Sequence, residues 1–231
     1  MHVTANMKIQ NRIIHSFLAA TLLSTFLQFF PTITLADSST GSERLSAEEQ
    51  ARLYPETMRY TIRRKGKTVG EHTITFQQDA NGLSVNVESK ITVTVLKVPV
   101  FRFNYTANEY WQSGNLVSVN ARTNRGGETT RASYIPDSTS QTSNHWNPEV
   151  LDTDTVFNTI TGNISKVNIE PIAEVTLTAG DQSISASHYR YTGDIQADVW
   201  YDDKNRWVKL QFKGDDGSTI SYIANPLVIN P

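Results

Sequence analysis

The stretch LSVNVESKITVTV, residues 83–95, decides the fold class of this chain. Apolar side chains occupy every second position from Leu83 to Val95, with Ser89 as the exception, and polar side chains fill the positions between them. This period of two is typical of a β-strand that turns one face to a core and the other to water. We therefore predict a long strand whose odd-numbered side chains, Ser89 excepted, point inward.

The same alternation recurs along the chain, in residues 101–106, 117–121, 195–201 and 208–212. Glycine-containing triplets that favour tight turns lie at residues 80–82, 113–115, 125–127 and 215–217. Strands joined by short turns pair antiparallel with their neighbours. The chain is thus predicted to be mostly β, a meander of about ten strands in a single curved antiparallel sheet that forms a half-barrel.

One segment departs from this period. Leu151, Val156, Phe157 and Ile160 follow helical spacing, an aspartate can cap the start, and a glycine can end the helix. We expect one short helix near residues 152–161, weak by itself because of its Thr and Val content and held by packing across the open face of the sheet.

The first 36 residues have the order of a secretory signal peptide. Lys8 and Arg12 give a basic start, residues 13–30 form an apolar run, and Ala36 ends a group of small residues that a signal peptidase would cleave. Met7 is an alternative start. Polar residues interrupt the apolar run too often for a good membrane-spanning helix. We expect a periplasmic protein, or alternatively an extracellular one, with no transmembrane segment after cleavage.

Cleavage after Ala36 leaves 195 of the 231 residues, enough for one domain. Residues 37–55 are predicted to be a flexible leader that ends in a short helical turn over 47–54, and residues 56–231 to be the β domain. Without Lys8 and Arg12, 19 basic residues face 23 acidic ones, a net charge of −4. This charge argues against a nucleic-acid partner and against tight binding to an anionic membrane surface.

The chain contains no cysteine, which excludes thiol catalysis, cysteine-ligated metals and lipid attachment at a lipobox. An exported chain without disulfides is typical of the bacterial periplasm. We find no motif for a phosphate loop, a dinucleotide site, a serine hydrolase or a zinc protease.

The densest polar and aromatic cluster is SNHWNP, residues 143–148, which we place in a loop. In a functional interpretation His145 is a base or ligand that Asn144 or Asn147 orients, and Trp146 contributes to binding. In a structural interpretation the asparagines cap turns, Trp146 is a buried plug between helix and sheet, and His145 bonds a backbone carbonyl. Trp200 is a further candidate, since aromatic side chains in a half-open sheet can line a groove or fill a core.

His188 is the second catalytic candidate, in a predicted strand. A metal pair of His145 and His188 would need a carboxylate, for which Asp194 or Asp198 is available. Nothing in the spacing requires such a site, so we predict neither a metal nor a cofactor.

Several of these motifs together resemble a known family. In chain order they are residues 143–147, 158–162, 188–191, 198–202, 206–208 and 216–218. They resemble a bacterial family of exported proteins, the domain of unknown function 6134, over roughly residues 60–223. The C-terminal hairpin is also loosely similar to other envelope proteins of unknown function with curved sheets of the lipoprotein-carrier type. The resemblance implies an export address and a fold, and it assigns no catalytic role.

Three functions follow as hypotheses. The first is a non-enzymatic envelope protein that holds an apolar ligand or a protein partner on a concave sheet. The second is a hydrolase or metal-dependent enzyme centred on His145. The third is a structural partner of an envelope assembly that uses an exposed sheet edge.

Overall fold

The computed structural model describes residues 44–135, 140–179 and 181–228. The predicted signal peptide, its cleavage site and residues 37–43 lie outside the described residues. The described chain forms twelve strands, one α-helix and one 3-10 helix: α1 (Ala47–Ala51), β1 (Thr57–Arg64), β2 (Lys67–Gln78), β3 (Leu83–Val95), β4 (Val98–Gln112), β5 (Asn115–Arg125), β6 (Glu128–Tyr134), η1 (Pro148–Asp152), β7 (Thr155–Asn158), β8 (Asn163–Ala179), β9 (Gln182–Gly193), β10 (Ala197–Asp202), β11 (Trp207–Lys213) and β12 (Thr219–Ala224).

The strands form one antiparallel sheet in the order β6-β5-β4-β3-β2-β1-β12-β11-β10-β9-β8-β7. Each half of this order is a meander of sequence neighbours, and the halves meet where β1 pairs with β12. There Tyr60 lies opposite Ala224, and Arg64 lies opposite Ile220. The predicted fold class is confirmed, with twelve strands instead of the expected ten or so.

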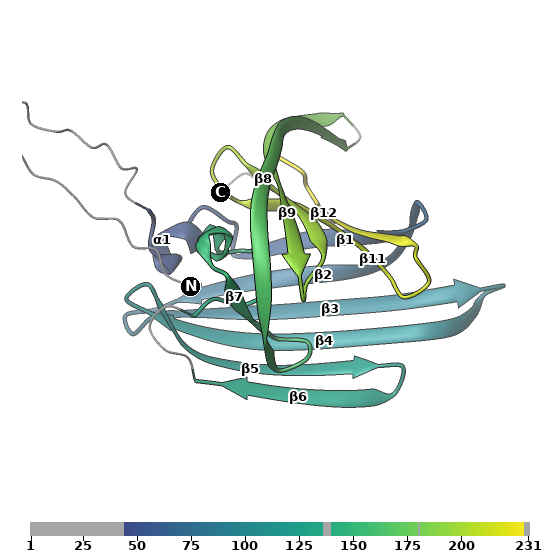
Figure 1. The fold of residues 1–231 in the computed structure, drawn as a ribbon, viewed down its shortest axis with the longest axis horizontal. Coiled ribbons are helices and arrows are strands. Elements are labelled where there is room, and N and C mark those ends of the chain that lie inside the picture. Colours follow the sequence, from purple (N-terminus) through teal and green to yellow (C-terminus); the bar gives the residue numbers. More distant parts are fainter. Residues whose placement is uncertain (1–43, 136–139, 180, 229–231) are drawn as a thin grey trace, which may run out of the picture. The chain divides into compact units, whose positions relative to one another are not determined.

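The sheet curls until its two ends nearly meet. Figure 1 shows β8 crossing in front of the long strands β3 to β5. The ring of Tyr134 on β6 stacks on that of Phe157 on β7, with centroids 4.5 Å apart. The loop after β6 is bonded to β7, because the Phe157 amide donates to the Gln141 carbonyl at 2.9 Å and the Ser143 amide donates to the Phe157 carbonyl at 3.0 Å. Side chains and this loop therefore bridge the gap between the sheet's edges.

The predicted register of β3 is confirmed over most of its length. Leu83, Val85 and Val87 are buried, and the residues between them are less so. Two details were wrong. Ser89 also points inward and is buried, because the pairing of β3 with β2 and β4 runs through it without a bulge. Val95 is exposed because β3 extends beyond the core there.

The helix predicted near residues 152–161 is not present. Residues 148–152 form the 3-10 helix η1, which Asn147 caps, and residues 155–158 form β7, which pairs with β8. The β-branched residues that made the helix weak favour an extended chain, and pairing with β8 satisfies its backbone groups.

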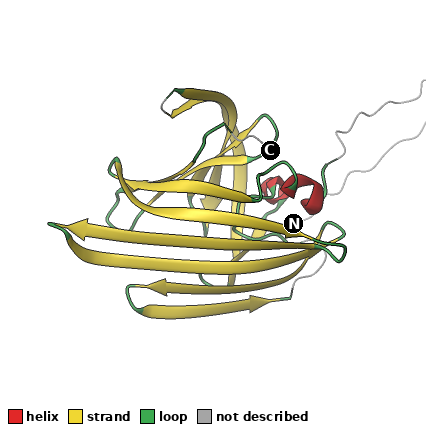
Figure 2. Ribbon diagram, turned by 180° about the vertical axis from the view of Figure 1, so that it is seen from behind, coloured by secondary structure: helices red, strands yellow, loops and turns green. Residues whose placement is uncertain are grey.

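The one α-helix of the described residues lies earlier, where a helical turn was predicted. Ser46 and Glu49 form a capping box at its start, and its residues Ala47, Gln50 and Ala51 are buried. From Ser46 on, this segment is packed structure and not a flexible leader. Figure 2 shows the helices together at one end of the sheet.

The helix α1 covers that end. Glu48 accepts a hydrogen bond from the amide of Gly114 at 2.9 Å, and the Gln50 side chain donates to the carbonyl of Asn205 at 3.1 Å. These partners lie in the β4–β5 and β10–β11 turns. The turns β1–β2, β3–β4, β5–β6 and β11–β12 lie at the opposite end. Among the helices of the described residues, none is long and apolar enough to cross a membrane.

Candidate functional site

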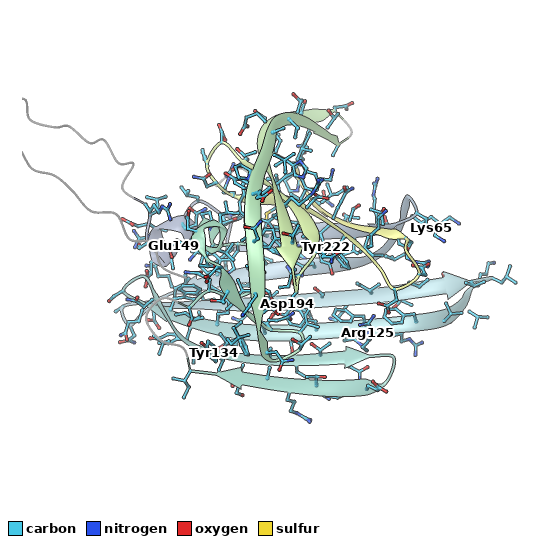
Figure 3. All side chains as sticks on the ribbon, in the orientation of Figure 1. Lys65, Arg125, Tyr134, Glu149, Asp194 and Tyr222 are labelled. Carbon is cyan, nitrogen blue, oxygen red and sulfur yellow. The ribbon has the colours of Figure 1, made fainter. Side chains whose placement is uncertain are left out.

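The concave side of the sheet encloses a cavity of about 530 Å³. Its lining runs from His72 and His145 in the interior to Arg125 and Asp215 at exposed turns, so it opens at the end opposite α1. The wall is mainly aliphatic and aromatic, and includes Ile91, Phe103, Leu210, Phe212, Ile220 and Tyr222. Figure 3 marks Tyr222 on the sheet and Arg125 near the turns.

A buried histidine–serine pair forms part of the inner wall. His72 on β2 lies opposite Ser89 on β3, and its Nδ1 is 2.5 Å from the Ser89 hydroxyl. Its Nε2 has no hydrogen-bond partner among the described residues. Burial, reinforced by the nearby His145, lowers the pKa of His72 to about 3. The ring is therefore neutral at pH 7.

The second interior histidine does not make the bond predicted for it. The carbonyl of His145 accepts from the Tyr201 hydroxyl at 2.9 Å, but the ring Nδ1 of His145 has no partner among the described residues. The ring packs instead against Tyr191 and Trp207, with centroids 5.3 and 5.7 Å away. Burial lowers the pKa of His145 to about 4, so this ring is also neutral at pH 7.

A chain of hydroxyl and amide groups forms the next part of the wall. The Tyr105 hydroxyl donates to Asn144 Oδ1 at 2.8 Å and lies 2.6 Å from the Thr159 hydroxyl. Thr159 in turn lies 3.2 Å from the Ser143 hydroxyl. Burial raises the pKa of Tyr105, so its hydroxyl stays protonated and able to donate. The cavity therefore has an uncharged polar wall beside its apolar one.

The loop that carries Asn144 and His145 is anchored by Glu109, which is fully buried on β4. One carboxylate oxygen accepts from Thr142 and from the Asn144 amide, both at 2.6 Å. The other accepts from the indoles of Trp111 and Trp146, at 3.0 and 2.9 Å. Four neutral donors thus hold this carboxylate and fix the loop against the sheet.

Two ion pairs connect the turns at the open end. Arg125 on β5 pairs with Asp215, and Arg64 on β1 pairs with Asp216. Both acids belong to the β11–β12 turn, and all four residues line the cavity. The first pair is notable because β5 and β11 are not neighbours in the sheet, so it spans the opening.

The structure places the predicted site residues in four different environments. Asn144 and His145 line the cavity. Trp146 is fully buried, as predicted, and its ring contacts those of Phe76 and Trp111. Asn147 is buried and caps η1.

His188 and Trp200 lie on the other face of the sheet. His188 stacks on Trp200, with centroids 4.4 Å apart, and its Nε2 is 2.8 Å from Asp198. Side chains alternate along β9, so His188 points away from Tyr191, which contacts His145. The pair of His145 and His188 considered for a metal is therefore not assembled, and the described residues contain no group of three His, Cys, Asp or Glu side chains suited to a metal.

Sequence reasoning overlooked His72, Ser89, Tyr105 and Glu109 as site residues. A signal for three of them was present, since each polar side chain occupies an inward position of an alternating strand: His72 before Ile74, Ser89 after Val87, and Glu109 before Trp111. A polar residue at a core position marks either a buried network or a site.

Comparison with known proteins gives a family and a fold. A family model described as Domain of unknown function (DUF6134) matches residues 60–225. No curated protein matches the chain. A solved structure described as a beta-barrel-like protein of domain of unknown function DUF1849 from Brucella abortus is similar, with a TM-score of 0.51 and 8% identity over 74% of this chain and 95% of that chain. At that identity the similarity concerns the fold alone.

Proposed function

This chain belongs to the family described as domain of unknown function 6134, and from that premise we propose that it is an exported binding protein that holds an apolar ligand in its cavity. The observation that carries the proposal is the cavity itself. Its 530 Å³ lies in the range of roughly 300–1,000 Å³ that small-molecule sites occupy. Water against its aliphatic and aromatic wall forms few hydrogen bonds, so an apolar ligand gains about 25 cal/mol for each Å² it buries.

The polar wall suggests the form of that ligand. Asn144, Tyr105 and the two neutral histidines offer hydrogen bonds without a formal charge. A ligand with an apolar body and one uncharged polar group at its inner end would match both walls.

The geometry favours binding over catalysis. The Ser89–His72 pair is the arrangement nearest to a nucleophile and base, but no carboxylate orients the ring, because Nε2 of His72 has no partner among the described residues. A ring whose pKa is about 3 is also a weak base at neutral pH.

Titration with Nile red, a neutral apolar fluorophore, tests the proposal. Phe103→Glu places a carboxylate in the cavity wall, and Ala197→Phe fills the cavity. Both should weaken Nile red binding about tenfold or more, as expected for losing the burial of a few apolar groups. Val117→Glu, an exposed apolar position on β5, is the matched control and should bind like wild type. Equal affinities of all four folded proteins would refute the proposal.

The site of action is proposed from the signal-like order of residues 1–36. We expect a mature product that begins at Asp37 in the periplasm. The intact mass of the protein in a periplasmic fraction measures this directly. A product that keeps residues 17–30 and sediments with membranes would contradict it.

A further inference from the structure

The tip of the β3–β4 hairpin, residues 95–100, is apolar and exposed. Leu96 is 93% exposed, and Val95, Val98 and Val100 are 55%, 61% and 60% exposed. Lys97 is the only charged residue among them. A contiguous group of exposed apolar side chains marks a surface that is covered in some functional state.

The hairpin tip projects beyond its neighbours in the sheet. The pairing of β2 with β3 ends at Ile91, and the pairing of β4 with β5 ends at Phe103. Between these points β3 and β4 pair with each other, and the one further backbone bond among the described residues is from the Gly126 amide to the Arg102 carbonyl, at 2.9 Å. Figure 1 shows this hairpin extending past β2 and β5 at the open end of the sheet. The tip is thus the part of this end that would touch a flat surface first.

The turn itself does not require an apolar residue. Leu96 and Lys97 have φ angles of 49° and 67°, in the left-handed region that Asn and Gly adopt most easily. A leucine here disfavours the turn's backbone conformation and is also placed in water. Its presence therefore points to a contact that this structure does not include.

The net negative charge expected of the mature chain argues against tight binding to an anionic membrane by the whole surface, but the charge at the end of the sheet that carries the hairpin tip is basic. The β1–β2 turn, at the same end of the sheet, carries Arg64, Lys65 and Lys67, and neither this turn nor the hairpin tip contains an acid. Asp216 pairs with Arg64 and lies 3.8 Å from Lys65, while Asp215 pairs with Arg125.

Lys67 and Lys97 have no ion-pair partner among the described residues. Unpaired cations around an apolar projection complement an anionic bilayer, whose headgroups attract Lys and Arg and whose interface accepts Leu and Val.

We propose that the hairpin tip docks this protein on an anionic lipid bilayer, with Leu96 and its neighbouring valines inserted into the interface. Val93, Val100 and Phe101 also line the cavity, so docking would bring the cavity opening to the bilayer surface. The inference goes beyond the proposed function, because the tip can dock whether or not the cavity holds a ligand.

Co-flotation of the purified mature protein with vesicles tests this. Wild type should float with vesicles that combine phosphatidylcholine and phosphatidylglycerol, less with phosphatidylcholine alone, and less in high salt. Leu96→Asn suits the left-handed turn, so the hairpin should remain folded, but partitioning should fall about tenfold or more. Lys97→Gln should weaken binding to the anionic vesicles only. The matched control is Val117→Asn, which should float like wild type.

Several outcomes would overturn the proposal. Failure of wild type to bind anionic vesicles would contradict the proposal. Flotation of Leu96→Asn protein to the same extent as wild type would also contradict it. Dimerisation that depends on Leu96, seen by sedimentation without vesicles, would assign the tip to a second copy of the chain. Nile red binding in solution should be the same for wild type and Leu96→Asn, so a failure of docking is separable from a failure of the cavity proposal.

Discussion

Replacing Glu109 by Gln tests the anchor of the site loop. The carboxylate receives Thr142 and Asn144 on one oxygen and Trp111 and Trp146 on the other. Glutamine has almost the same shape but only one acceptor oxygen. If the NH₂ group faces Trp111 and Trp146, both indole bonds are lost. If it faces Thr142 and Asn144, the Asn144 bond is lost, whereas the Thr142 hydroxyl can turn to accept. In either case the bonds that remain run to a neutral group.

The magnitude follows from the contacts. A hydrogen bond to a charged group contributes about 1.5–3 kcal/mol and one between neutral groups about 0.5–1.5 kcal/mol, so losing at least one bond and weakening the others amounts to roughly 3–6 kcal/mol. Removing the buried charge returns part of this as relief from desolvation. We expect a net loss of about 3 kcal/mol in the free energy of unfolding, a large share of the ~5–15 kcal/mol typical of a domain.

Urea denaturation followed by tryptophan fluorescence measures this loss, since two of the donors are indoles. Glu88→Gln is the matched control, because Glu88 lies on the outer face of β3 and its side chain is 47% exposed; it should change stability by about 0.5 kcal/mol or less. A Glu109→Gln protein as stable as this control would show that the four hydrogen bonds accepted by Glu109 do not stabilise the fold. Weakened Nile red binding by Glu109→Gln would show that the anchor also positions Asn144 and His145.

The remaining predictions concern stability. Val87→Asp should cost several kcal/mol because it buries an unpaired charge, whereas Glu88→Ala should cost roughly 0.5 or less; equal melting temperatures would contradict the register of β3. Trp146→Ala should cost about 3–5 kcal/mol in urea titrations, and a loss under about 1 kcal/mol would contradict its packing role. Burial lowers the pKa of His72 to about 3 and that of His145 to about 4. Histidine in the unfolded chain has a pKa of about 6.5, so the unfolded chain binds more protons in acid than the folded protein does. The two lowered pKa values should therefore leave the free energy of unfolding unaffected above about pH 6.5. As the pH drops toward 4, each ring should lower that free energy by up to about 1.4 kcal/mol per pH unit. Urea midpoints for wild type and the double variant His72→Gln/His145→Gln, measured between pH 7 and pH 4.5, check this; equal slopes would contradict it.

The parts of the fold that depend on local pattern could be predicted. Alternation in residues 83–95 and the glycine-containing turns are local features, and they indicated an antiparallel meander that the structure confirms. The segment 152–161 could not be assigned locally, because its helical spacing competes with β-branched residues and the decision rests on pairing with β8. The pairing of β1 with β12, some 160 residues apart, leaves no local trace.

The candidate site was predicted in part. The cluster around His145 was recognised because it is dense in polar and aromatic residues, and it does contribute Asn144 and His145 to the cavity. Its partners Glu109 and His72 were missed because each is a single polar residue inside an otherwise ordinary strand. Only the register places them against the loop, and register depends on contacts between distant parts of the chain.

The meeting of β1 and β12 in the middle of the sheet makes the chain divisible. Residues 57–134 and 155–224 are each a complete run of neighbouring strands, and their shared seam is the one pairing between them. The seam cannot form until the last strand has emerged from the ribosome or the export channel, so closure is a late, non-local step in folding. For the same reason the two halves, produced as separate polypeptides, should reassemble by complementation. A circular permutant that joins the present ends and opens the chain between residues 135 and 140 should keep every strand pair.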